Sequence, residues 1–152
     1  LARTLAGHGV HSVILGDLSY AMAADIEDVE PYIHVVGKEW PVRAALAYAQ
    51  VADAVVATES LIANSVAQED MLKVVTLSHS SNENLTKHWK NTAAIEPKAI
   101  ACHPCHRIHG HTFAFCQTDT NTGCSACQAA AGPDLVAGIV LDWLRIQHRE
   151  AA

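Results

Sequence analysis

Cysteine and histidine residues that could bind a metal gather in CHPCHRIHGHTFAFC, residues 102–116, and in CSAC, residues 124–127. The two segments hold all five cysteines of the chain and four of its ten histidines. Thiolate and imidazole are the ligands that zinc prefers in proteins, and thiolates also hold iron. The composition of these segments therefore indicates a bound structural zinc or iron, with clustered thiols that in a reducing compartment stay free of disulfides.

Three interpretations of this segment remain open. C-x-x-C-H at residues 102–106 is the attachment motif of covalent haem, which requires export to an oxidising compartment. The cysteines are alternatively small buried apolar residues without a metal. A tetrahedral metal site needs four soft ligands, and four thiolates would leave no open position for a substrate. Two ligand sets qualify: Cys102, Cys105, Cys124 and Cys127 with repeated C-x2-C spacing, or Cys102, Cys105, Cys116 and Cys127.

The elements before this segment alternate between strand and helix. Short runs rich in Val and Ile predict strands, and Ala- and Leu-rich runs with apolar residues three and four apart predict helices. The predicted strands are 10–16, 32–37, 54–58 and 73–78, with a fifth short one at 98–104. The predicted helices are 19–29, 41–52, 60–70, the polar segment 82–91, and 132–152.

This alternation is typical of βα units on a parallel sheet. The predicted fold is α/β, with a Rossmann-like parallel sheet flanked by helices in a single domain over 1–152. A cysteine-rich C-terminal insert at 98–131 precedes the long final helix. The opening LARTLAGHG resembles the last turns of a helix before a glycine cap, so we expect further chain upstream.

Ligands of open parallel sheets bind beyond the carboxyl ends of the strands, where loops enter helices. Ser60 at a helix start would favour a phosphate there, but it is equally explained as a plain helix cap. Asp17 is alternatively a turn residue, and Lys38 a solvated lysine. The loops that follow the predicted strands are Gly16-Asp17, Gly37-Lys38, Thr58-Glu59-Ser60 and Ser78-His79-Ser80-Ser81.

Charge and hydropathy argue against a nucleic-acid-binding or membrane-spanning protein. Sixteen acidic residues against ten Lys and Arg give a net charge of −6, which lacks the basic face that nucleic-acid binding requires. No apolar run is long enough for a membrane span, and no secretory signal is recognisable. Neither G-x-G-x-x-G nor a P-loop motif occurs. We therefore expect a cytoplasmic protein that binds neither nucleic acid nor membrane.

The run YIHVVGKEWPVRAALAYAQVADAVVATESLIANSVA followed by KVVTLSHSS resembles the donor-binding half of bacterial ADP-heptose lipopolysaccharide heptosyltransferases. These are family-nine glycosyltransferases of GT-B fold. The resemblance covers about residues 1–90, and the cysteines before a final helix resemble the family's C-terminal end. It implies an ADP-sugar as donor substrate, and it favours Cys102, Cys105, Cys116 and Cys127 as metal ligands, because a similar four-cysteine finger occurs in some members.

The family's D-[ST]-G-x-x-H turn would lie at Glu59, Ser60, Leu61 and Asn64, and only Ser60 matches it. Leu61 replaces a glycine that lets the diphosphate approach the backbone, and Asn64 replaces a histidine. The resemblance places the nucleoside near the loops after Gly16 and Gly37, with Asp17 as a possible ribose partner.

The resemblance assigns the catalytic base and the acceptor surface to an N-terminal domain, so no catalytic residue of this chain is predicted. It implies that the chain is half of a transferase, inactive by itself. The alternative is a non-catalytic metal-binding or interaction module on the same fold. Exposure of Leu1, Leu5 and Trp143 in the absence of that domain would make a homodimer plausible.

Overall fold

The computed structural model describes residues 1–15, 33–36, 40–106 and 116–150. They divide into two compact units, Leu1–Val51 and Ala52–Ala152. Each unit combines helices with parallel strands, so the chain has a mixed α/β fold.

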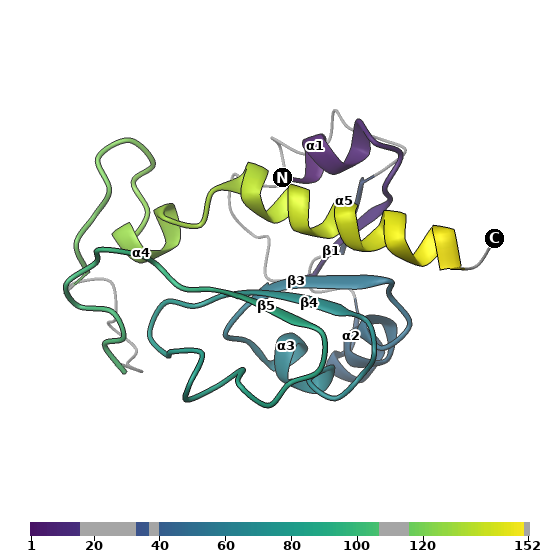
Figure 1. Ribbon diagram of the computed structural model, residues 1–152, viewed down its shortest axis with the longest axis horizontal. Coiled ribbons are helices and arrows are strands. Elements are labelled where there is room, and N and C mark those ends of the chain that lie inside the picture. The colour runs from purple at the N-terminus through teal and green to yellow at the C-terminus, as the bar shows by residue number, and fades with distance from the viewer. Residues whose placement is uncertain (16–32, 37–39, 107–115, 151–152) are drawn as a thin grey trace. The chain divides into compact units, whose positions relative to one another are not determined.

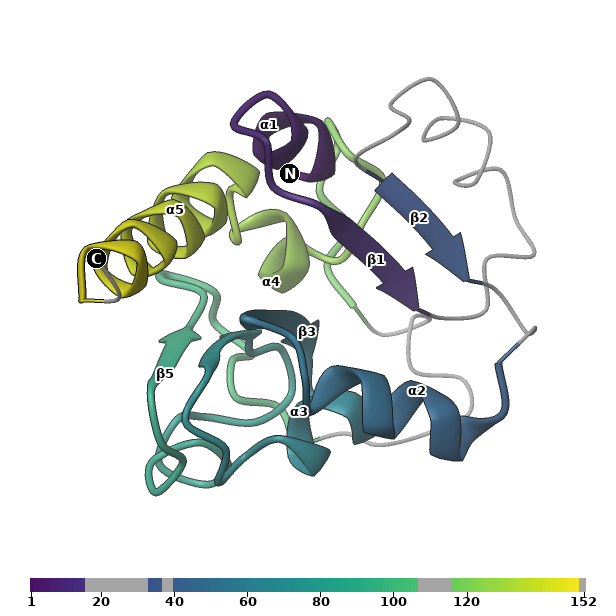
Figure 2. The ribbon, with the colours of Figure 1, turned by 90° about the vertical axis from the view of Figure 1, so that its right-hand side faces the viewer.

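The first unit holds a pair of parallel strands, β1 (Ser12–Leu15) and β2 (Ile33–Val36), which lie side by side in Figure 2. Helix α1 (Ala2–Ala6) contacts β1 and ends at Gly7, as the glycine-rich sequence predicts. Leu5 is 6% exposed, so the expectation that it lies on the surface is wrong. Helix α2 (Val42–Ala49) begins after Pro41, and Trp40 packs edge to face on its Tyr48 with ring centroids 5.1 Å apart.

The second unit is built on a three-stranded parallel sheet in the order β3-β4-β5. Strand β3 (Ala54–Thr58) pairs with β4 (Leu72–Thr76), which pairs in turn with β5 (Thr92–Ile95). Helix α3 (Leu61–Ser65) and the long helix α5 (Pro133–Glu150) lie on opposite sides of this sheet in Figure 1. A short helix α4 (Ala126–Ala129) precedes α5.

The central strand β4 is buried on both faces because its side chains alternate between the two helices. Val75 and, just beyond the strand, Leu77 pack with Ala63 of α3. Val74 points the other way, toward the side from which α5 contacts β4. The buried residues of α5 are Val136, Ala137 and Val140. The apolar runs that predicted β3 and β4 therefore form the core of this unit.

Lys73 is a charged residue within this core. It is fully buried on β4, and its Nζ donates a hydrogen bond to the backbone carbonyl of Glu69. Burial lowers the pKa of Lys73, although the nearby carboxylates of Asp70 and Glu69 oppose this change. The ammonium group thus has a desolvation cost that its carbonyl partner offsets only in part.

Three sequence predictions in this unit are wrong in detail. The fifth strand is Thr92–Ile95, not 98–104. Residues 82–91 form successive turns, with hydrogen bonds such as Asn84 N to Ser81 O, and not a regular helix. The predicted helix 60–70 ends at Ser65 and continues as turns. The predicted helix 19–29 lies outside the described residues.

None of the helices in the described ranges combines the length and the apolar character needed to cross a bilayer.

Candidate functional site

The loops that follow β3 and β4 meet at the carboxyl edge of the three-stranded sheet. The strands are parallel and pair Thr58 with Thr76, so both loops leave the sheet at the same edge. Glu59, directly after β3, reaches across to the loop that begins at Ser78. The structure therefore brings together four residues that the sequence singled out separately: Glu59, Ser78, His79 and Ser80.

Glu59 is the centre of this group. Its side chain is only 4% exposed. The Oε2 atom accepts hydrogen bonds from Ser78 Oγ at 2.6 Å and from the backbone N–H of His79 at 3.3 Å. The Oε1 atom accepts one from the backbone N–H of Ser80 at 2.6 Å. His79 Nδ1 lies 2.7 Å from Oε2, so a single carboxylate joins the two loops.

These donors keep Glu59 ionised despite its burial. Burial by itself raises the pKa of Glu59, because it disfavours the charged form. The hydrogen bonds from the Ser78 hydroxyl and from the backbone amides of the loop outweigh this effect and lower the pKa below its usual value. At neutral pH the centre of the group is therefore an anion surrounded by donors.

The segment that contains Cys102 and Cys105 fixes the other side of the same loop. The backbone N–H of His106 donates to the carbonyl of His79 at 2.8 Å. His103 Nε2 lies 3.0 Å from the carbonyl of Ser80. The sequence analysis grouped these histidines with the cysteines as residues that could bind a metal. Their clustering was the available signal, but only the fold reveals that they hold residues 79–80.

Three residues of the predicted binding turn lie at the start of α3. Ser60 and Asn64 make hydrogen bonds within this helix, and Leu61 is exposed. Ser60 Oγ accepts a 3.4 Å hydrogen bond from the backbone N–H of Ala63 and so caps α3. Asn64 Nδ2 donates to the carbonyl of Ser60 at 2.8 Å. Leu61 is 61% exposed at the position where the resemblance expects glycine. Thr58 is exposed at the end of β3. The predicted residues Gly16, Asp17 and Lys38 lie outside the described residues.

The cysteines fall into two parts of the chain. Cys102 and Cys105 lie in the turn segment after β5, while Cys116 and Cys127 flank a hairpin that contains Cys124. The hairpin is closed by a Thr118–Ser125 bridge, by Asp119 N to Cys124 O at 2.9 Å, and by Ala126 N to Gln117 O at 2.7 Å. Helix α4 begins at Ala126, so the antiparallel pairing ends at Gln117 and Ala126, and Cys127 lies in the first turn of the helix.

Cys124 is exposed at the turn, whereas Cys116 and Cys127 are half-buried. Asp119 stabilises the turn by accepting hydrogen bonds from the amides of Asn121 and Thr122. Within the described ranges, however, no three His, Cys, Asp or Glu side chains converge as a metal site would require.

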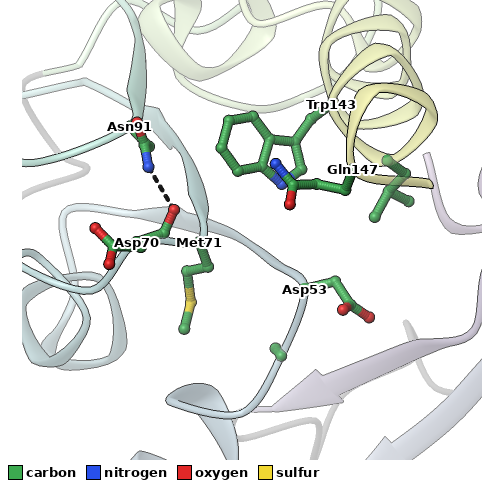
Figure 3. A pocket seen from close by; sticks show the side chains of 8 residues that line it. Asp53, Asp70, Met71, Asn91, Trp143 and Gln147 are labelled. Atoms are coloured by element: carbon green, nitrogen blue, oxygen red, sulfur yellow. Dashed lines mark hydrogen bonds between the residues drawn. The ribbon is translucent and has the colours of Figure 1, made fainter. Parts of the chain in front are cut away.

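A pocket of about 470 Å³ lies at the opposite, amino edge of the sheet. It is lined by the residues that precede the three strands and by the second half of α5, with Asp53, Asp70, Asn91 and Trp143 among them (Figure 3). Asn91 Nδ2 donates to the backbone carbonyl of Asp70. Sequence reasoning did not select these residues, because nothing in their spacing indicates that they meet.

Comparison with protein-family models, with curated proteins and with solved structures finds no match for this chain.

Proposed function

We propose that the chain binds a nucleotide sugar at the carboxyl edge of β3 and β4, as the donor-binding half of a heptosyltransferase-like glycosyltransferase with a Rossmann-like sheet. The observation that carries this proposal is the Glu59 carboxylate, which joins the loops after two parallel strands. Polar side chains from two loops thereby form one fixed group at the edge where parallel sheets bind ligands. The transfer reaction itself would require an acceptor surface from another domain.

The chemistry of this group favours the sugar over the diphosphate as its partner. Glu59 already occupies the backbone N–H groups of His79 and Ser80, which would otherwise suit a phosphate. Imidazole nitrogens and hydroxyl oxygens remain, and these pair well with sugar hydroxyls. The exposed Leu61 also covers the position at which the family's diphosphate approaches the backbone. We therefore place the sugar, and not the phosphates, beside His79.

Calorimetric titration with ADP, ADP-glucose and UDP-glucose tests the proposal. We expect saturable binding of ADP-glucose that Glu59→Gln weakens, because the amide cannot accept all the donors that fix the loop. Asp53→Asn at the amino edge is the matched control and should bind like the unaltered chain. Circular dichroism of each variant checks that it is folded. The absence of saturable heat with any of the three nucleotides would overturn the proposal.

A structural metal clasp in the cysteine segment is a second candidate function. It is favoured by the half-buried Cys116 and Cys127, each two residues from the Thr118–Ser125 bridge, together with the C-x2-C spacing of Cys102 and Cys105. The thiolates suit zinc or iron, and a clasp would brace the segment that holds residues 79–80.

Metal analysis of the purified protein tests the clasp. We expect one metal ion per chain, lost in Cys116→Ser and in Cys127→Ser. Cys124→Ser is the matched control and should keep the metal. Loss of metal in Cys124→Ser with retention in Cys116→Ser would favour the other ligand set, and a metal-free protein would reject both.

A further inference from the structure

The hydrogen-bond partners of His79 assign its tautomer. An ionised carboxylate only accepts hydrogen bonds, and Glu59 Oε2 lies 2.7 Å from His79 Nδ1. The proton of a neutral His79 ring therefore sits on Nδ1, and Nε2 carries the lone pair. The side chain is 30% exposed, while Glu59 is 4% exposed. The ring is thus anchored on its buried nitrogen and is accessible to a ligand.

Ser78 cannot act as the nucleophile of a Ser-His-Glu triad in this arrangement. Its Oγ lies 2.6 Å from Glu59 Oε2 and 3.5 Å from His79 Nδ1. In such a triad the serine bonds to the nitrogen that the carboxylate does not hold. Here serine and carboxylate lie beside the same nitrogen, so the group is not built for acyl transfer. Nε2 of His79 is therefore the atom of this group that can accept a hydrogen bond from a ligand.

The backbone on both sides of His79 is fixed, which restricts where the ring can go. His106 N bonds to the carbonyl of His79, and His103 Nε2 donates to the carbonyl of Ser80, since a carbonyl only accepts. Asn84 Nδ2 lies 3.4 Å from His106 Nε2 and ties this segment to the turns after Ser81. Fixed contacts of this kind reduce the ordering cost of binding.

We infer that His79 is the ligand-contacting residue of this edge, with Nε2 accepting a hydrogen bond from a hydroxyl of the bound sugar, and that Glu59 is a positioning residue that fixes this tautomer. The inference rests on the proposed function, because it takes the sugar of a nucleotide sugar as the ligand. It assigns to His79 a role in distinguishing the sugar nucleotide from the free nucleotide.

The His79→Asn variant isolates this contact. Its amide nitrogen can still donate to Glu59, but no atom replaces Nε2. We expect the affinity for ADP-glucose to fall about tenfold, the value of one lost hydrogen bond to a neutral group, while the affinity for ADP is unchanged. His88→Asn, the same exchange at an exposed histidine in the neighbouring turns, is the matched control and should change neither affinity.

The outcomes separate this inference from the proposed function. Equal loss for ADP and ADP-glucose, or no loss for either, would overturn the role of His79 and leave nucleotide-sugar binding intact. If the unaltered chain binds none of the nucleotides, the proposed function fails and the inference fails with it.

A spectroscopic readout tests the role of Glu59 without relying on a variant. Long-range proton–nitrogen NMR spectra of the unaltered protein, recorded at a pH where the His79 ring is neutral, should show the proton on Nδ1, and a dominant Nε2–H form would contradict the inference. In Glu59→Gln we expect a mixture of both tautomers, which a merely structural role would not produce. Glu59, His103 and His106 are the titratable neighbours, and the His103 and His106 signals serve as internal references.

Discussion

The carboxyl edge of the three-stranded sheet is joined by one buried carboxylate, whereas the carboxylates of the amino edge face solvent. Glu59 is 4% exposed and surrounded by donors, while the side chain of Asp70 is 88% exposed and pairs with Lys90 at 3.2 Å. The amino edge has an open pocket of about 470 Å³, and the Asp70–Lys90 pair beside it is exposed. The two edges of the same sheet therefore differ in how deeply their carboxylates are buried.

The largest difference should appear when a carboxylate is deleted at each edge. Glu59→Ala leaves the Ser78 hydroxyl and two backbone amides without an acceptor in a buried site. We expect it to lower the unfolding free energy by about 3 kcal/mol, against less than about 0.5 kcal/mol for Asp53→Ala. Urea unfolding measures both values. Equal losses would remove the contrast between the two edges.

Low pH should reduce the stabilisation that the ionised Glu59 provides at the carboxyl edge. The pKa of Glu59 is lower in the folded chain than its ordinary value of 4.5, so its stabilising effect is complete above 4.5. The effect is lost as the pH falls through the folded-state pKa. The stability difference between the unaltered chain and Glu59→Gln should therefore be constant near neutral pH and shrink below pH 4.5. A difference that stays constant down to pH 3 would contradict the assigned ionisation.

Replacing the buried Lys73 on β4 should have the opposite effect on stability to replacing Glu59. Lys73→Met removes a desolvated charge, and we expect it to stabilise the fold by about 1 kcal/mol at neutral pH. The pKa of Lys73 is below its ordinary 10.5 in the folded chain, so the unaltered protein gains stability as the pH rises toward that value. The advantage of Lys73→Met should shrink accordingly in urea unfolding at increasing pH. A destabilised variant would indicate that the Glu69 contact outweighs desolvation.

The smallest effects should come from a long cap hydrogen bond at the carboxyl edge and an exposed ion pair at the amino edge. Ser60→Ala removes the cap of α3 and should cost about 0.5 kcal/mol, because its 3.4 Å hydrogen bond is long. Asp70→Ala should cost at most a few tenths of a kcal/mol, since its pairing with Lys90 is exposed, roughly the value of a surface ion pair. Thermal unfolding resolves this order, and a larger loss for Asp70→Ala would reverse it.

The sequence predicted the buried strands but not the edge strand. Val- and Ile-rich runs identify β1 to β4, because β-branched residues favour strands. Strand β5 reads TAAI, which has little strand propensity, and it forms because it can pair with β4. Residues 82–91 were predicted as a polar helix, but nearby side chains stabilise turns there: Ser81 Oγ accepts a hydrogen bond from the backbone N–H of Asn84, and Asn82 Oδ1 accepts one from Thr86 Oγ1.

The location of the candidate site could be predicted from the sequence, but the hydrogen bonds within it could not. The rule for parallel sheets selects the loops that contain Glu59 and His79, and the structure brings both together. Glu59 bonds to the Ser78–Ser80 loop, and His103 reaches the carbonyl of Ser80. Both contacts depend on distances between segments that are about twenty residues apart in the sequence. No local pattern in a sequence encodes such distances.

Glu59 also competes with free anions for the hydrogen-bond donors of the Ser78–Ser80 loop. The donors that it occupies, two amides and a hydroxyl of the Ser78–Ser80 loop, are those that a free anion would use. A tethered group competes at an effective concentration on the order of millimolar or higher. Phosphate or carboxylate compounds in solution can occupy this loop only by displacing Glu59, so the edge should discriminate against small anions.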